Sequence, residues 1–434
     1  MLLIKKNIYL DNAGATKVDK DVRKIMAFSE KMFFANPSAI YKDGVEVRNK
    51  IEEERTKIAK QINAHNDEII ITSSGTESDA MAILGTINNY ELRIKNEKLE
   101  YKIPHIVTSK IEHPAVMENC RYLEDNGRAE VTYVGVDKNG LINLEELKDS
   151  LKENTILVSI MYANNEIGTI EPIEEIAKII RHFKKIKQGK ENNFFGFSDE
   201  GGRGARPFNN HFVFPIFHTD ACQAMNYLFT ENIEKLGVDL LSFNSSKIYG
   251  PKGIGILYKK RNVDICPLYM GGGQEFGLHS GTESISLIKG ISLALEITNK
   301  IKEKENKRLT KIRDYAIDKL LSLSGLYGYK IILNGGRENR LSNNVNISIS
   351  NISSELLVIE LSAQGIFVSE KSACKSNDDG KSYVIDAIRK VCPRDGVVAD
   401  GSLRISFGRD NKMRDVDVLY KGLRKILEKY KNWK

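Results

Sequence analysis

The amino-acid sequence predicts an α/β protein with two lobes, the larger one built around a mainly parallel sheet that helices cover on both faces. The chain of 434 residues is longer than one typical domain, which favours two lobes with separate cores. From about residue 40 to residue 260, helix-like stretches alternate with short apolar runs, as in α/β folds. After residue 265 this alternation stops, and the remaining pattern suits a smaller α+β lobe.

The elements of the larger lobe follow from their periodicity. Apolar residues at helical spacing predict helices over 46–62, 144–153 and 173–185. Short runs between them predict strands over 68–72, 105–109, 131–136, 155–163, 214–221 and 239–243. Several runs are apolar throughout, which is typical of strands buried on both faces. Ligands of such sheets bind beyond the carboxyl ends of the strands, so we expect functional residues there.

The smaller lobe has a different order of elements. A glycine-rich loop at 271–277 leads into a helical tract over about 283–325. A strand-like run at 343–350, a helix near 354–364 and a strand–helix pair around 403–430 follow.

Residues 187–211 are rich in Gly and Asn and predict a long loop. The loop leads to the amino end of the strand that ends in His-Thr-Asp. We therefore expect this loop on the side of the sheet away from a ligand. There it would bind a partner or form an addition to the surface of the lobe.

Composition excludes several classes of function. The 65 basic and 58 acidic residues are spread along the chain, so the net charge of +7 predicts a mixed surface and no direct nucleic-acid binding. No apolar stretch reaches the about 20 residues that span a bilayer, and the first residues do not form a secretion signal. Five cysteines without a C-x-x-C pair indicate reduced thiols and no metal site. We expect a cytoplasmic protein.

Two residues at predicted strand ends suggest cofactor chemistry. Lys247 follows a buried strand and precedes a Gly-Pro-Lys-Gly turn; burial lowers a lysine's pKa, as imine formation with an aldehyde requires. By itself it would more often be a surface lysine. Asp220 ends an apolar strand, where a carboxylate needs a cationic or hydrogen-bonded partner. A protonated pyridine nitrogen would be such a partner, and the pairing would keep the ring an electron sink.

Two further strand ends carry weaker signals. In TSSGTESDA (72–80), Gly75 and Thr76 open a helix, whose amides and hydroxyl could hold a phosphate. The alternative is an ordinary capping box between Thr76 and Asp79. In IEHPAV (111–116), His113 could stack on a flat ring and relay protons, or it could be structural.

Motifs of high specificity and constant order cover nearly the whole chain. They are LDNAGAT (10–16), ANPSA (35–39), TSSGTES (72–78), IEHPAV (111–116), MYANNEIGT (161–169), HTDACQA (218–224), SKIYGPKG (246–253), GGGQEFG (271–277) and SGTES (280–284). In this order the sequence resembles the cysteine desulfurases of the class V aminotransferase fold, with 187–211 as the main extra segment. The resemblance implies the pyridoxal-phosphate (PLP) fold type I, with a mainly parallel seven-stranded sheet. It also implies a large cofactor-binding domain at 15–265 and a small domain at 1–14 and 266–434.

The resemblance assigns roles to matching positions. Lys247 would form the imine with pyridoxal 5'-phosphate, Asp220 would pair with its pyridine nitrogen, His113 would stack on the ring and Gln223 would bind the phenolic oxygen. The phosphate would be held by Gly75, Thr76, Asn244 and Ser246, joined by Thr282 from the second subunit of a homodimer. The substrate L-cysteine would contact Asn165, Asn36 and Arg404, whose guanidinium matches a carboxylate.

The nucleophile is expected in KSACKS (371–376). Cys374 stands among small residues before a glycine- and aspartate-rich stretch, as a thiol on a loop would. The family's matching motif holds the cysteine that accepts sulfur as a persulfide. The distance from Cys374 to Ser382 matches the long-loop branch, which passes sulfur to proteins such as an iron–sulfur scaffold or a tRNA-thiolation enzyme. We expect the other four cysteines to be inert, with Cys222 on the interior side of its motif.

Some positions depart from the family pattern. Ser-x-His-Lys is replaced here by Asn244-Ser245-Ser246-Lys247, and the arginines of the glycine loop by Phe276 and His279. Each lost charged hydrogen bond predicts weaker cofactor binding by about 1.5–3 kcal/mol. Two alternatives stay open: a selenocysteine lyase or another carbon–sulfur lyase, and a non-catalytic dimeric scaffold.

Overall fold

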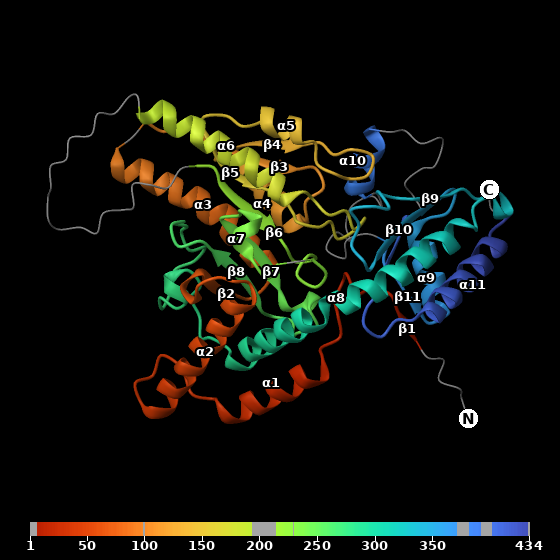
Figure 1. The fold of residues 1–434 in the computed structure, drawn as a ribbon, viewed down its shortest axis with the longest axis horizontal. Coiled ribbons are helices and arrows are strands. Elements are labelled where there is room, and N and C mark those ends of the chain that lie inside the picture. Colours follow the sequence, from red (N-terminus) through yellow and green to blue (C-terminus); the bar gives the residue numbers. More distant parts are fainter. Residues whose placement is uncertain are drawn as a thin grey trace.

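The computed structural model describes residues 7–98, 100–192, 214–228, 230–370, 382–391 and 402–432. These residues form a large sheet covered by helices and a smaller sheet at the other end of the molecule (Figure 1). No helix within the described ranges has both the length and the apolar character that crossing a lipid bilayer requires.

The large sheet has seven strands in the order β2-β8-β7-β6-β5-β3-β4. They are β2 (Ile69–Thr72), β3 (His105–Ser109), β4 (Glu130–Val134), β5 (Thr155–Ser159), β6 (Ile216–Asp220), β7 (Leu240–Asn244) and β8 (Gly255–Lys259). Strand β8 runs antiparallel to both of its neighbours, β2 and β7, while the pairs from β7 to β4 are parallel. The expected α/β fold with a mainly parallel seven-stranded sheet is thereby confirmed.

Alternate residues of these strands enter two separate hydrophobic cores. On one face, Ile70 and Ile106 pack with side chains of α3 (Gly75–Glu97) and α4 (Pro114–Asp125). On the other face, Ile71 and Val107 belong to a core that includes α2 (Lys42–Gln61) and α6 (Ile173–Asn192). Burial on both faces explains why the strands are apolar throughout. The shorter helices α5 (Leu144–Asp149) and α7 (Ile233–Leu236) both contact α6.

The smaller sheet is antiparallel, with the order β12-β10-β9. Its strands are β9 (Ile331–Leu333), β10 (Asn344–Ile349) and β12 (Ser402–Ser406), and helices α9 (Ser354–Ala363) and α11 (Met413–Lys429) belong to the same part. Helix α10 (Tyr383–Val391) packs instead against Ile111, Val136, Met161 and Ile167 of the larger part. The amino-terminal strand β1 (Ile8–Tyr9) pairs in parallel with β11 (Ile366–Phe367) beside this sheet. The amino-terminal segment therefore lies in the smaller, carboxy-terminal part of the molecule.

One long helix joins the two parts. Helix α8 (Ile285–Leu321) contacts α1 (Lys20–Met32) and α2 as well as β9, β10 and α11 (Figure 1). The predicted domain division at residue 265 stays a prediction, because α8 bridges both parts. Short 3-10 turns complete the fold at η1 (Asn66–Glu68), η2 (Ser245–Lys247), η3 (Glu275–Gly277) and η4 (Leu326–Gly328).

Two local expectations were wrong. Helix α6 continues to Asn192, so the first residues of the predicted 187–211 loop are helical. The segment KIKQGKEN is rich in Lys, Glu and Gln, whose high helix propensity outweighs the single glycine. Strand β8 was not predicted, because GILYK was taken as part of the motif after Lys247. The chain re-enters at Phe214, at the amino end of β6 and so opposite the end that carries Asp220.

Candidate active site

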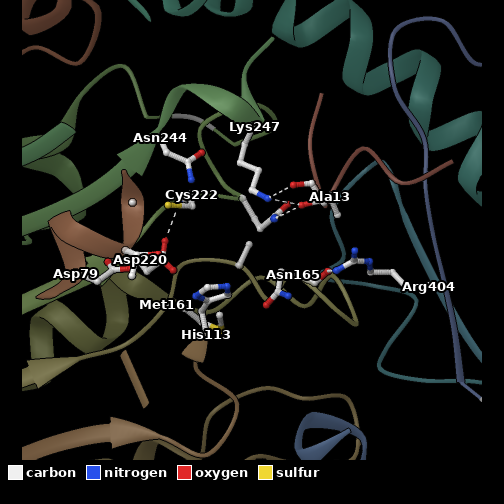
Figure 2. Close-up of a pocket in the computed structure, with 15 residues that line it drawn as sticks. Ala13, Asp79, His113, Met161, Asn165, Asp220, Cys222, Asn244, Lys247 and Arg404 are labelled. Atoms are coloured by element: carbon white, nitrogen blue, oxygen red, sulfur yellow. Dashed lines mark hydrogen bonds between the residues drawn. The ribbon is translucent and has the colours of Figure 1, made fainter. Parts of the chain in front are cut away.

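A cavity of about 150 Å³ lies at the carboxyl ends of β6 and β7, where parallel-sheet proteins bind their ligands. The first turns of α3 and α4, the segment after β5, the amino-terminal loop and β12 complete its wall (Figure 2). Its lining residues are Ala13, Gly14, Gly75, Thr76, Asp79, His113, Met161, Ala163, Asn165, Asp220, Cys222, Gln223, Asn244, Lys247 and Arg404.

Lys247 reaches the cavity from η2, which follows β7 directly. Its Nζ donates to the carbonyl oxygens of Ala13, at 2.7 Å, and Gly14, at 2.5 Å. These carbonyls are held in place because the nitrogen of Ala13 donates to Oγ of Ser406 on β12. The smaller lobe thus helps to position the main-chain acceptors of the lysine, which Figure 2 shows beside Ala13.

Asp220 stands at the carboxyl end of β6 and is buried. Its Oδ1 accepts a hydrogen bond of 2.8 Å from the main-chain nitrogen of Cys222. In Figure 2 the carboxylate of Asp220 and the amine of Lys247 approach the cavity from different sides. The predicted pair therefore faces one shared space.

His113 is the N-cap residue of α4, and its Nδ1 accepts a hydrogen bond of 3.1 Å from the nitrogen of Ala115. Burial, the largest cause, lowers the pKa of His113, and the nearby cations Lys247 and Arg404 lower it further, against the opposing effect of Asp220. The ring is therefore neutral, and its proton resides on Nε2 because Nδ1 is an acceptor. His113 offers the cavity a flat ring with one N–H donor.

The first turn of α3 brings its main chain against the cavity. A Cβ added at Gly75 would lie 2.6 Å from Sγ of Cys222, so only glycine allows this close approach. Thr76 also lines the cavity. The alternative capping box between Thr76 and Asp79 is wrong: the N-cap is Ser74, whose hydroxyl accepts from the nitrogen of Glu77.

Arg404 enters from β12 and is buried. Its Nη2 donates to Oδ1 of Asp11 at 2.7 Å and its Nη1 to the carbonyl oxygen of Asn165 at 3.3 Å. Its Nε has no hydrogen bond to any residue that the structure describes. A guanidinium with donor capacity left over beside a cavity can bind a carboxylate.

Two more predicted residues line the cavity. Gln223 donates from Nε2 to the carbonyl oxygen of Ala13 at 3.0 Å, and Asn244 ends β7 beside Gly75. Ser246 does not line the cavity. Its Oγ lies 3.4 Å from Oδ1 of Asn244, so it contacts a residue of the cavity wall rather than the cavity itself.

Two predicted residues lie elsewhere within this chain. Thr282 is exposed before α8, and Asn36 is exposed with its Oδ1 accepting from the nitrogen of Ser38. Neither lines the cavity.

Cys374 lies outside the described residues, as does Cys392. Burial raises the pKa of the three described thiols, Cys120, Cys222 and Cys266. A raised pKa keeps these thiols protonated and poorly nucleophilic. The sequence predicts Cys222 on the interior side of its motif. In the structure it lines the cavity beside Gly75.

Both flanks of the KSACKS segment contact the site. On one side, the main chain of Ser369 pairs with that of Arg404, with N···O distances of 3.1 and 2.7 Å. On the other side, Oγ of Ser382 donates to Oε2 of Glu166, next to Asn165, at 2.5 Å. The hydroxyl of Tyr383 donates to the carbonyl oxygen of Glu112, next to His113.

The glycine loop packs on α2 and α3. Buried Glu275 forms a two-pronged ion pair with Arg55, at 2.6 and 2.7 Å, and also accepts from the nitrogen of Ile71. His279 binds Oε1 of Glu77 in the first turn of α3 at 2.8 Å. Hydrogen bonds, led by that from His279, outweigh burial and lower the pKa of Glu77 to about 2, while Glu77 raises the pKa of His279.

Sequence reasoning missed several cavity residues. Asp79 lines the cavity next to Asp220, and Met161 and Ala163 line it from the segment after β5. All three stand in motifs that the sequence displays, but only the fold shows which side chains of a motif face inward. Among the described residues, no group of three or more His, Cys, Asp or Glu side chains is arranged to hold a metal ion.

The chain matches known proteins over most of its length. The family described as Aminotransferase class-V matches residues 8–187 and 211–419 and leaves the intervening segment unmatched. The chain is 40% identical over 427 residues to cysteine desulfurase IscS of Dictyoglomus turgidum, covering 98% of this chain and 96% of that protein. It is 38% identical over 427 residues to cysteine desulfurase IscS of Methanosarcina thermophila, covering 98% and 93%.

Solved structures show the same likeness. A structure described as a NifS-like protein aligns with a TM-score of 0.80 and 34% identity, covering 98% of this chain and 100% of that one. A structure described as SspA in complex with cysteine aligns with a TM-score of 0.69 and 28% identity, covering 92% and 98%.

Proposed function

The chain belongs to the cysteine desulfurases of the class V aminotransferase family, and from this premise we propose that it moves the sulfur of L-cysteine onto Cys374 with the help of pyridoxal 5'-phosphate. L-Alanine is the second product. The observation that supports this best is the convergence of Lys247, Asp220 and Arg404 on one cavity.

The residues of the cavity fit pyridoxal phosphate. The amine of Lys247 suits an aldehyde, the carboxylate of Asp220 suits a protonated ring nitrogen, and the ring of His113 supplies a flat face. The absence of a side chain at Gly75 lets an anionic group approach the amides that begin α3. When bound, the cofactor supplies an electron sink for the substrate's Cα.

The chain's own residues perform the remaining tasks. Arg404 binds the substrate carboxylate, and Asn165 lies beside it. With the cofactor bound, the amine of Lys247 would be placed to take the proton from Cα, and neutral His113 would offer a hydrogen bond through Nε2.

The thiolate of Cys374 attacks the substrate sulfur. A sulfur–sulfur bond forms, the Cβ–sulfur bond breaks, and its electron pair stays with carbon, which is then protonated to yield alanine. The raised pKa of each described thiol disfavours Cys120, Cys222 and Cys266 as the nucleophile.

We further propose that a second copy of the chain completes the phosphate site. Asn244 and the helix amides carry no formal positive charge, while Thr282 is exposed and does not line the cavity of its own chain. Large apolar side chains are exposed between α1 and α2 and beside the glycine loop, at Phe34 (81%), Ile40 (94%) and Met270 (84%). Burial of such residues against a second copy would form a homodimer.

The acceptor of the sulfur is proposed on family grounds alone. It is a protein of iron–sulfur cluster assembly or of tRNA thiolation, and the reaction takes place in the cytoplasm. Selenocysteine lyase activity is the competing assignment.

The test compares wild type, Cys374→Ala and the matched control Cys266→Ala. Wild type and both variants are expected to bind the cofactor, with a visible band that borohydride removes. Cys374→Ala should form no alanine from cysteine, while Cys266→Ala, which alters a thiol away from the cavity, should match wild type. Alanine formation by Cys374→Ala at the wild-type rate would refute the nucleophile, and turnover of selenocysteine only would favour the lyase.

A further inference from the structure

A second buried acid, Asp79, borders the cofactor cavity beside Asp220. It is the fifth residue of α3, its side chain is 2% exposed, and it lines the same cavity. Figure 2 shows both carboxyl groups on the side of the cavity away from Arg404. A buried carboxyl group without a cationic partner is costly to ionise, so its protonation state must follow from its surroundings.

Among the described residues, the charged groups that shift the pKa of Asp79 do not include a cation. The charged groups that act on it, Asp220 from β6 and Glu112 from the segment before α4, are both acidic. The nearest ring nitrogen, Nε2 of His218, lies 3.5 Å from Oδ1 of Asp79. Burial lowers the pKa of His218 to about 3, so its ring is neutral between the hydroxyls of Ser159 and Ser242.

The two carboxyl groups differ in their hydrogen bonds. Oδ1 of Asp220 accepts from the main-chain nitrogen of Cys222, whereas Oδ1 of Asp79 has no hydrogen bond to any described residue. The hydroxyl of Ser242 hydrogen-bonds to Asp79. Burial, and next the charge of Asp220, raise the pKa of Asp79 well above its ordinary value. Two neighbouring buried carboxyl groups cannot both ionise readily, and the main-chain donor at Asp220 supports the charge there rather than on Asp79.

We propose that Asp79 is a positioning residue that retains its proton, so that the pair of Asp79 and ionised Asp220 presents one negative charge to the pyridine nitrogen of the cofactor. Asp79 acts through Asp220 and does not contact the reacting atoms. This inference rests on the proposed function, because it takes the pyridine nitrogen to lie at Asp220.

The first test uses the protein without cofactor, so it does not depend on activity. Infrared difference spectra at neutral pH between wild type and Asp79→Asn should show a carboxylic-acid C=O band that the variant lacks. Glu171→Gln is the matched control, because burial raises the pKa of Glu171 to about 8 and this side chain does not line the cavity. That variant should also lose a carboxylic-acid band. A wild-type band unchanged in Asp79→Asn would mean that Asp79 is ionised and would overturn the proposal.

The second test measures cofactor binding. Asp79→Asn should keep the affinity and the visible band of wild type, because an amide resembles the protonated acid. Asp220→Asn should weaken binding by about 10- to 150-fold, as expected when a charged hydrogen bond is lost. Equal weakening in both variants would show that Asp79 must be charged, and the inference would fail.

Two provisions keep the outcome decisive. Should Asp79→Asn not fold, ¹³C-labelled aspartate in the wild-type protein shifts the carboxylic-acid band of an aspartate but not that of Glu171. A wild-type protein that shows no visible band with the cofactor would refute the proposed function. The infrared result would still establish the protonation state of Asp79.

Discussion

Replacement of Arg404 by lysine tests how the cavity recognises an amino-acid carboxylate. In the structure the guanidinium donates to Asp11 and to the carbonyl oxygen of Asn165, and its Nε has no described partner. A lysine retains the positive charge and can still pair with Asp11. It cannot present two parallel donors to a carboxylate, because an ammonium group lacks the planar fork.

The expected size of the effect follows from these contacts. Arg404→Lys removes one charged hydrogen bond to the substrate, which is worth about 1.5–3 kcal/mol. Since about 1.4 kcal/mol corresponds to a factor of ten, the KM for cysteine should rise by roughly 10- to 150-fold. The effect should fall on KM more than on kcat, because this contact is present in both the ground state and the transition state. The folded state should change little, as the ion pair with Asp11 persists.

Steady-state formation of alanine, measured against cysteine concentration, checks this prediction. Arg313→Lys is the matched control, because Arg313 is also a buried arginine that donates to main-chain carbonyl groups, those of Arg340 and Leu341, but does not line the cavity. The control should leave the KM unchanged. An Arg404→Lys variant with a wild-type KM would refute the assignment of Arg404 to the substrate carboxylate.

Three further outcomes are expected. Gly75→Ala should weaken cofactor binding, because its Cβ would lie 2.6 Å from Sγ of Cys222; the double variant with Cys222→Ala should recover part of the affinity in a fluorescence titration, and no recovery would refute the steric argument. Tyr383→Phe removes the hydrogen bond that ties α10 to the segment before α4, so persulfide formation should slow while the visible band stays unchanged, and equal single-turnover rates would contradict this. Because Glu77 raises the pKa of His279, the pair stabilises the folded state below about pH 6.5 and this contribution is lost as the pH rises through the folded-state pKa. Melting temperatures of wild type and His279→Gln should therefore converge with rising pH, and a constant difference would argue against the ion pair.

Much of the fold could be read from local patterns. The apolar runs that became β3, β5 and β6 are buried on both faces, and this burial shaped their composition. Strand β8 was not predicted, because its residues directly follow the Gly-Pro-Lys-Gly turn and were read as part of the Lys247 motif. The end of α6 was misjudged because one glycine in a Lys- and Glu-rich stretch does not end a helix.

The site residues could be proposed from the same strand ends, but their grouping could not. Sequence spacing cannot show that Ser246 lies behind Asn244, that Thr282 lies away from the cavity, or that Asp79 lies within it. The role of Asn36 likewise stays a prediction, because this residue is exposed in a single chain.

The sequence alone determined the fold class, the family and the types of residue at the strand ends, since periodicity and motif order are local properties of the chain. Only the tertiary structure decided which of these groups meet. The carbonyls of Ala13 and Gly14, near the amino terminus, accept hydrogen bonds from Lys247, and Arg404, near the carboxyl terminus, lines the same cavity. Asp79, in the first turns of α3, lines that cavity together with Asp220. Such meetings depend on long-range packing. The resulting burial shifts the pKa of Asp79, and no neighbouring residue in the sequence indicates that shift.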